Sequence, residues 1–186
     1  MKVMMKLLWM AVVLPLLVAC GGTSKNEGGA VGVNEYDTSL ADADGIQRMT
    51  AYHFTDTIRV DGRSYVYTID RVSSDSLPVI TDEEGNRYAD NSYTLTIQSG
   101  GQTVFQRQFT KKTFMSYLTG EFQQRGILDG MMYDSTLPGF RFAVSVSLPQ
   151  SDMMEPLLMQ VDTNGGIVIT RDERGEAELE DDEDGV

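Results

Sequence analysis

Residues 140–148 read Phe-Arg-Phe-Ala-Val-Ser-Val-Ser-Leu, and this regular alternation decides the class of fold. The apolar positions are Phe140, Phe142, Val144, Val146 and Leu148. Successive side chains of a β-strand point to opposite faces of its sheet, so the pattern predicts a strand with one buried face. We expect the intervening residues Arg141, Ser145 and Ser147 to face water.

Other segments on both sides of this strand share its alternation or its enrichment in β-branched and aromatic residues. They are residues 52–60, 65–69, 93–97, 104–109, 127–133, 157–162 and 167–171. The pairs Asp61-Gly62, Gly100-Gly101 and Asn164-Gly165 are typical of tight turns between antiparallel neighbours. The sequence therefore predicts a mainly β protein, with about eight antiparallel strands in a meander that forms a small barrel or a two-layer sandwich.

One segment departs from this period. Thr110 can cap a short helix over residues 111–118, and a second turn at 121–125 would end at Gly126. Phe114, Tyr117 and Leu118 would form its apolar stripe. We expect this short helix to close one end of the sheet; the alternative is a lid over a ligand cavity.

The N-terminus has the features of an export signal. Lys2 and Lys6 form a short basic segment, and residues 7–19 are apolar. As a helix this apolar run would be about 20 Å long, at about 1.5 Å per residue, against roughly 30 Å of bilayer hydrocarbon. We therefore expect residues 1–19 to be a cleaved signal peptide and not a membrane-spanning helix.

The apolar run ends in Leu17-Val18-Ala19-Cys20, which resembles the lipobox of bacterial lipoproteins. The resemblance implies that Cys20 carries a thioether-linked diacylglycerol and becomes the N-terminus of the mature protein. The alternative is a secreted protein with a free Cys20. Because Cys20 is the only cysteine, we expect no internal disulfide and no cysteine-based metal site.

Composition divides the remaining chain into three parts. Residues 20–50 hold the lipidated cysteine and a flexible tether rich in Gly, Ser, Asn and Asp. Residues 51–171 form the β domain, and residues 172–186, with nine acidic residues, are expected to be a disordered acidic tail. The formal net charge of −13 becomes −15 when Lys2 and Lys6 leave with the signal peptide, so a nucleic-acid partner is not expected.

Residues 76–82, Ser-Leu-Pro-Val-Ile-Thr-Asp, stand shortly before Gly85, Tyr88, Ala89, Asp90 and Asn91. With Phe109-Thr110-Lys111 and residues 140–149, they are similar to a family of uncharacterised Bacteroidetes lipoproteins, catalogued as a domain of unknown function. The resemblance covers roughly residues 52–170 and carries no known activity. It implies a lipid-anchored protein of the Gram-negative cell envelope, at the outer membrane, and leaves open whether it faces the periplasm or the cell surface.

Few residues suggest catalysis or metal binding. His53 is the sole histidine and lies near Asp56, so we expect a surface histidine and not a catalytic one.

The loop at 82–86, with Asp90 and Asn91, has oxygen ligands for calcium but lacks the spacing of an EF-hand, and we expect a solvated loop with Asx-turns. The strand tyrosines could stack on sugars, but we expect packing in the core or at its rim, with a hydroxyl at the surface. They include Tyr65, Tyr67, Tyr88, Tyr93 and Tyr133.

These observations favour a membrane-anchored envelope lipoprotein with a non-enzymatic binding role, towards an unknown protein or small molecule. The alternative is a lipocalin-like carrier whose strands enclose one small apolar ligand. An envelope hydrolase is a third class, and we expect no enzyme, no cofactor and no metal. A deep apolar cavity would favour the carrier, and a filled interior would favour surface binding.

Overall fold

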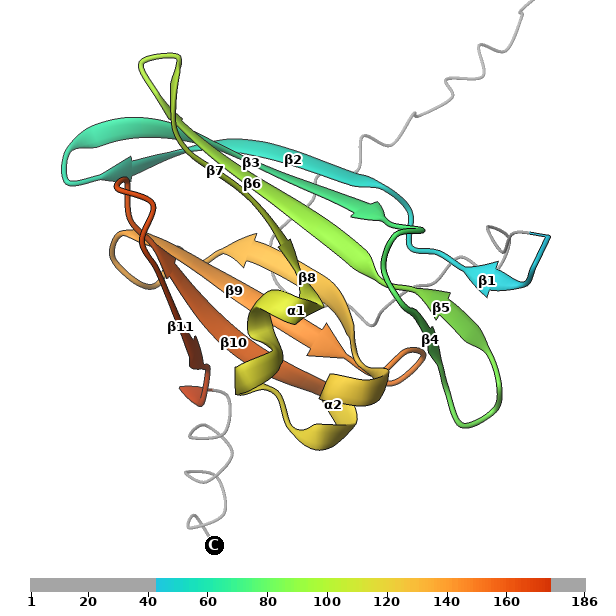
Figure 1. The fold of residues 1–186 in the computed structure, drawn as a ribbon. Helices are drawn as coiled ribbons and strands as arrows, with labels where there is room; N and C mark the ends of the chain where they lie inside the picture. Colours follow the sequence, from blue (N-terminus) through green and yellow to red (C-terminus); the bar gives the residue numbers. More distant parts are fainter. Residues whose placement is uncertain (1–42, 175–186) are drawn as a thin grey trace, which may run out of the picture. The chain divides into compact units, whose positions relative to one another are not determined.

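The computed structural model describes residues 43–174, in which two four-stranded meanders are joined by a helical segment (Figure 1). The predicted signal peptide, Cys20 and most of the acidic tail lie outside these residues. The strands are β1 (Ile46–Gln47), β2 (Tyr52–Val60), β3 (Arg63–Ser73), β4 (Val79–Thr81), β5 (Arg87–Ala89), β6 (Asn91–Ser99), β7 (Gln102–Thr110), β8 (Ile127–Tyr133), β9 (Phe140–Ser147), β10 (Met154–Val161) and β11 (Ile167–Arg171). The helical segment comprises α1 (Lys111–Phe114), a 3-10 turn at Met115–Tyr117 and α2 (Gly120–Arg125).

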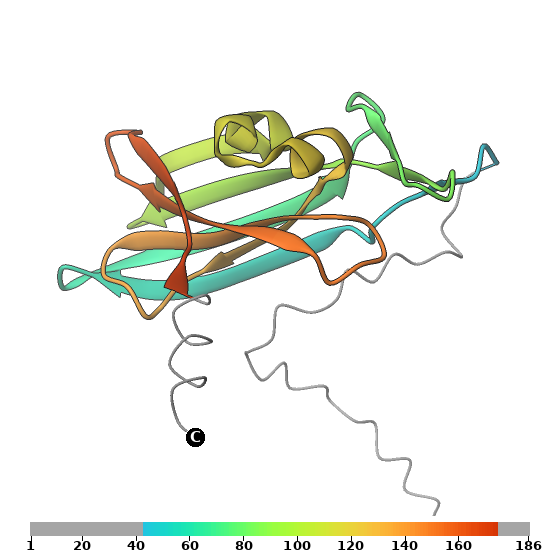
Figure 2. The same cartoon turned by 90° about the horizontal axis from the view of Figure 1, so that it is seen from below.

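The eight longer strands form two antiparallel sheets with the orders β2-β3-β6-β7 and β11-β10-β9-β8. The sheets lie one above the other in Figure 1, and the β8–β11 sheet lies in front when the molecule is seen from below in Figure 2. Neither sheet's edge strands pair with the other sheet within residues 43–174, so the architecture is a two-layer sandwich and not a closed barrel. The predicted eight strands, their meander and the three hairpin turns are confirmed.

Large side chains from both sheets fill the space between them. Phe142 is fully buried, and its ring centroid lies 6.0 Å from that of Tyr67 in the opposite sheet. Tyr65 and Phe140 meet edge to face at 4.9 Å. The predicted core face of β9 is confirmed over the strand, whereas Leu148 lies just beyond its end and is half-buried.

The prediction that Ser145 and Ser147 face water is wrong, since they are 8% and 4% exposed. A β-bulge between Leu128 and Gly130 brings the Asp129 carboxylate to Ser145, whose hydroxyl donates to Asp129 Oδ1 at 2.8 Å. A Cβ atom on Gly130 would stand 2.1 Å from the same hydroxyl, so this close approach requires glycine. Ser147 is paired with Ile127 of β8, and Ile127 belongs to a second apolar cluster.

That second cluster joins the large sheets to a third, small sheet of order β1-β5-β4. It consists of Met49, Ile80, Tyr88 and Ile127. β1 runs parallel to β5, with Ile46 and Gln47 paired to Arg87 and Tyr88. Residues 46–49, which were predicted to belong to the tether, are therefore part of the folded region, and β1, β4 and β5 were not predicted.

The helical segment confirms the predicted short helix and its second turn, with the 3-10 turn between them. Phe114 and Leu118 are 0% and 5% exposed and belong to the main core, and Phe114 stacks on Phe109 of β7 at 6.2 Å. Glu155 Oε2 in β10 accepts the backbone N–H and hydroxyl of Thr119, each at 2.9 Å. The segment is thus packed into the sandwich.

Candidate functional site

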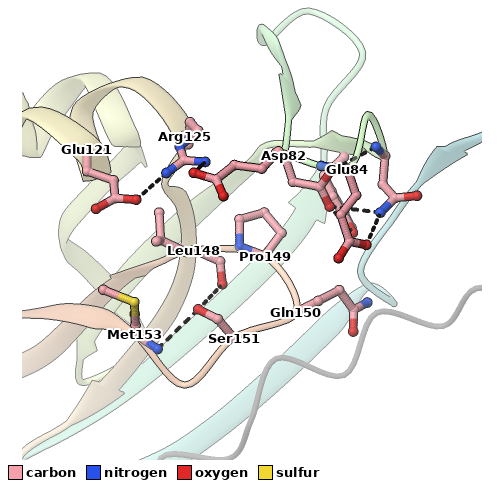
Figure 3. A pocket seen from close by; sticks show the side chains of 12 residues that line it. Asp82, Glu84, Glu121, Arg125, Leu148, Pro149, Gln150, Ser151 and Met153 are labelled. Atoms are coloured by element: carbon pink, nitrogen blue, oxygen red, sulfur yellow. Dashed lines mark hydrogen bonds and ion pairs between the residues drawn. The ribbon is translucent and has the colours of Figure 1, made fainter.

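A hollow of about 350 Å³ lies where the β4–β5 turn, α2 and the β9–β10 turn meet (Figure 3). We call it the acidic hollow. It is lined by four carboxylates and one guanidinium. The carboxylates belong to Asp82, Glu83, Glu84 and Glu121, and the guanidinium belongs to Arg125. Leu148, Pro149 and Met153, from the connection between β9 and β10, supply its apolar surface. Four carboxylates against one guanidinium make the hollow unsuitable for an anion.

The polar groups of the acidic hollow already bind one another. Arg125 pairs with Glu83 at 2.8 Å and with Glu121 in the preceding turn of α2. The hydrogen bond that Arg125 donates to the Glu83 carboxylate is the main reason why the pKa of Arg125 is raised. The guanidinium therefore neutralises part of the acidic rim, and a ligand would have to compete with these pairs.

Asp82 is also occupied, because it builds the turn that the sequence suggested as a calcium loop. Its Oδ1 accepts the N–H groups of Glu84 at 3.0 Å and Asn86 at 2.8 Å, which is an Asx-turn, and its Oδ2 accepts the Tyr88 hydroxyl at 3.1 Å. Burial opposes ionisation of Asp82, but the hydrogen bonds from Asn86, Tyr88 and Glu84 lower its pKa below the usual range. Within residues 43–174 no cluster of three or more potential metal ligands occurs.

Asp90 and Asn91, which the calcium hypothesis grouped with Asp82, lie elsewhere and are buried. Asp90 Oδ1 accepts the N–H groups of Asn91 at 2.8 Å and Leu128 at 3.0 Å, and the Asn91 side chain donates to the Leu128 carbonyl at 3.0 Å. Burial raises the pKa of Asp90, whereas burial lowers the pKa of nearby Lys111. These groups link β6 to β8 and have a structural role.

His53 lies on the outer face of β2, with its side chain 69% exposed. Its Nδ1 contacts Asp70 Oδ1 at 2.6 Å, and its Nε2 lies 3.4 Å from Thr55 Oγ1. The acid, histidine and hydroxyl follow the order of a hydrolase triad, but the Nε2–Oγ1 distance is long and the open sheet face does not exclude water. The expectation of a surface histidine is met, although its partner is Asp70 on β3 and not Asp56.

The free edge of β2 differs from the acidic hollow because it exposes two large aromatic side chains to solvent. β2 pairs with β3 on one side and with no described strand on the other. Tyr52 and Phe54 are 41% and 37% exposed, and their rings stack with centroids 6.3 Å apart and an interplanar angle of 3°. The Arg71 guanidinium lies 5.6 Å from the centre of the Tyr52 ring.

An aromatic series leads from this edge into the core. Phe54 lies 5.9 Å from Tyr67, and Tyr67 lies 5.4 Å from Tyr133 at the end of β8. Most of the tyrosines singled out in the sequence are buried, so the expectation of core packing holds for them: Tyr65, Tyr67, Tyr88 and Tyr93. Tyr52 and Phe54 were missed, and the signal that could have found them is their alternation at the start of β2.

The predicted lipidation site, Cys20, lies outside the described residues. Among the helices of residues 43–174, none has the length and apolar character needed to cross a bilayer. A family model described as "Domain of unknown function (DUF4738)" matches residues 32–169. No curated protein matches the chain.

Proposed function

We propose that the chain, which belongs to the family of the domain of unknown function DUF4738, is a lipid-anchored protein of the bacterial cell envelope that binds a partner without catalysing a reaction. We place it at the outer membrane of a Gram-negative bacterium. The anchor would be Cys20, and the binding surface would be the free edge of β2.

The observation that carries the binding role is the stacked pair of Tyr52 and Phe54 on an unpaired edge strand. Aromatic side chains that are partly exposed give large contact areas at small entropic cost, and such residues are enriched in binding interfaces. Free strand edges are places where another chain can pair. The partly exposed aromatic pair and the free backbone edge both belong to β2.

The filled interior favours surface binding over the carrier alternative. Phe142, Tyr67 and Tyr133 lie within 6.0 Å of one another, measured between ring centroids, in the space where a lipocalin-like protein would hold its ligand. The acidic hollow lies outside this core, and its rim is charged. Neither place suits a small apolar molecule.

The anchor is tested by labelling with a radioactive fatty acid in cells that export the protein. Cys20→Ser should abolish the label and move the protein from the detergent phase to the aqueous phase, because the thiol is the acceptor. Ser24→Ala, four residues away, is the matched control and should keep the label. Labelling that persists in Cys20→Ser would contradict the anchor.

The binding role is tested with a photo-crosslinking amino acid placed at Tyr52 in intact cells. Val168 on edge strand β11, which is 58% exposed, is the matched control position. We expect a discrete crosslinked species from position 52 and none from position 168. Equal crosslinking at the two positions, or none at position 52, would contradict a binding role for this edge.

A further inference from the structure

The β2–β3 hairpin determines which backbone groups of β2 point away from the sheet. Its loop is the pair Asp61-Gly62, with φ values of 49° and 76°, as in a type I′ turn. In such a hairpin the flanking residues, Val60 and Arg63, exchange both hydrogen bonds. Since the pattern alternates, the backbone groups of His53, Thr55, Thr57 and Arg59 point to the free edge. In agreement, the Thr57 N–H donates to the Asp56 carboxylate at 2.6 Å and not to β3.

The inner row of β2 side chains determines what kind of strand could be added there. Tyr52, Phe54, Ile58 and Val60 are apolar, and Asp56, which is exposed, stands in the middle of the row. Asp56 pairs directly with Tyr67, and burial together with this carboxylate raises the pKa of Tyr67 to about 12. A strand laid beside β2 would desolvate Asp56, and a buried carboxylate without a cation is costly.

A second copy of β2 cannot supply that cation, because its inner row contains no lysine or arginine. The basic side chain must therefore come from a strand whose sequence differs from that of β2. The chain's formal net charge of −13 also attracts a basic segment at long range.

We infer that β2 takes up an extended segment of a partner protein as a fifth strand, whose inward side chains follow the order apolar, basic, apolar so that the basic residue meets Asp56 between Phe54 and Ile58. The inference rests on the proposed binding role and names the partner's chemistry. The added strand forms hydrogen bonds with the backbone groups of β2 that point to the free edge. The Thr57 N–H, which now donates to the Asp56 carboxylate, would instead donate to a backbone carbonyl of the partner. The Asp56 carboxylate is then free to pair with the partner's cation.

The probes are two short synthetic peptides, acetyl-Thr-Val-Thr-Lys-Thr-Val-Thr-amide and the same peptide with Glu in place of Lys. They are titrated calorimetrically into the full chain carrying Cys20→Ser. We expect the Lys peptide to bind about tenfold more tightly than the Glu peptide, as for one favourable charge pair. Asp56→Lys should reverse the order of the two peptides.

Thr55→Pro separates strand addition from a simple charge attraction. Proline removes a backbone N–H that points to the free edge and leaves the β2–β3 hydrogen bonds in place, so binding of both peptides should be lost while the thermal midpoint changes little. Val168→Asp, on the edge strand β11 of the second large sheet, should leave binding unchanged. Undiminished binding by Thr55→Pro, or equal binding of the two peptides, would overturn the inference.

The failure of this inference can be distinguished from the failure of the proposed function. Crosslinking from position 52 without any charge preference between the peptides would keep a partner at this edge and reject the basic residue opposite Asp56, and crosslinking with undiminished peptide binding by Thr55→Pro would reject strand addition. The absence of crosslinking at position 52 would reject the binding role itself.

Discussion

β9 and β2 are both alternating strands, and their surroundings differ. β9 lies between β8 and β10, and its apolar face is buried, with Phe142 fully enclosed. β2 lies at an edge, and of its inner row only Ile58 is buried. Alternation in a sequence thus identifies the apolar face of a strand, but the neighbouring strands decide whether that face is covered.

Proline substitution tests this comparison most severely. Ala143→Pro in β9 removes a hydrogen bond from the middle of a central strand and leaves the acceptor carbonyl of a neighbouring strand without its partner, and we expect a loss of about 3 kcal/mol or more in the free energy of unfolding. Thr55→Pro in β2 should cost about 1 kcal/mol or less, because its N–H points outward. Urea denaturation of both variants measures the difference. Equal losses would show that β2 is not a free edge.

Truncation of an aromatic side chain sharpens the same contrast. Phe142→Ala should cost about 3 to 5 kcal/mol, the range for a buried aromatic residue. Phe54→Ala should cost less, about 1 kcal/mol, since this side chain is 37% exposed and loses only its contacts with Tyr52 and Tyr67. Arg141→Ala, beside Phe142 on the opposite face, should stay within about 0.5 kcal/mol. A small effect of Phe142→Ala would contradict the packed interior.

The smallest effect is expected at the turn of the acidic hollow, which belongs to neither strand. The folded-state pKa of Asp82 lies below its usual value, so the ionised carboxylate stabilises the fold above the unfolded pKa of about 3.9. This contribution should disappear as the pH falls through the lower folded-state pKa. Wild type should therefore be more stable than Asp82→Asn at neutral pH, and the difference should vanish in acid. Urea denaturation across a pH series checks this, and a difference that grows in acid would reverse the assigned sign.

The sequence predicted the large strands well because each spans several alternations and ends at a recognisable turn. β1, β4 and β5 have two or three residues each, which is too short for a period to be seen. The burial of Ser145 depends on the bulge at Asp129 and could not be predicted from local pattern. A local sign that β2 would be an edge strand was present in Asp56, a charged residue in the middle of the row that faces the opposite sheet.

The partner of His53, by contrast, could have been predicted. With Asp61-Gly62 as a two-residue loop, Val60 stands opposite Arg63, and counting back along both strands places His53 opposite Asp70. The same count places Asp56 opposite Tyr67, on the other face from His53. The candidate loop at 82–86 was interpreted correctly as an Asx-turn, but its distance from Asp90 depended on the unpredicted small sheet.

The small sheet gives the fold a defined order of mechanical failure. Force applied through the chain ahead of residue 43 reaches β1 before β2. β1 is held by two paired residues, whereas β2 is paired to β3 along nine. Tension should detach β1 first and lengthen the segment ahead of the sandwich, while the two large sheets remain intact under load.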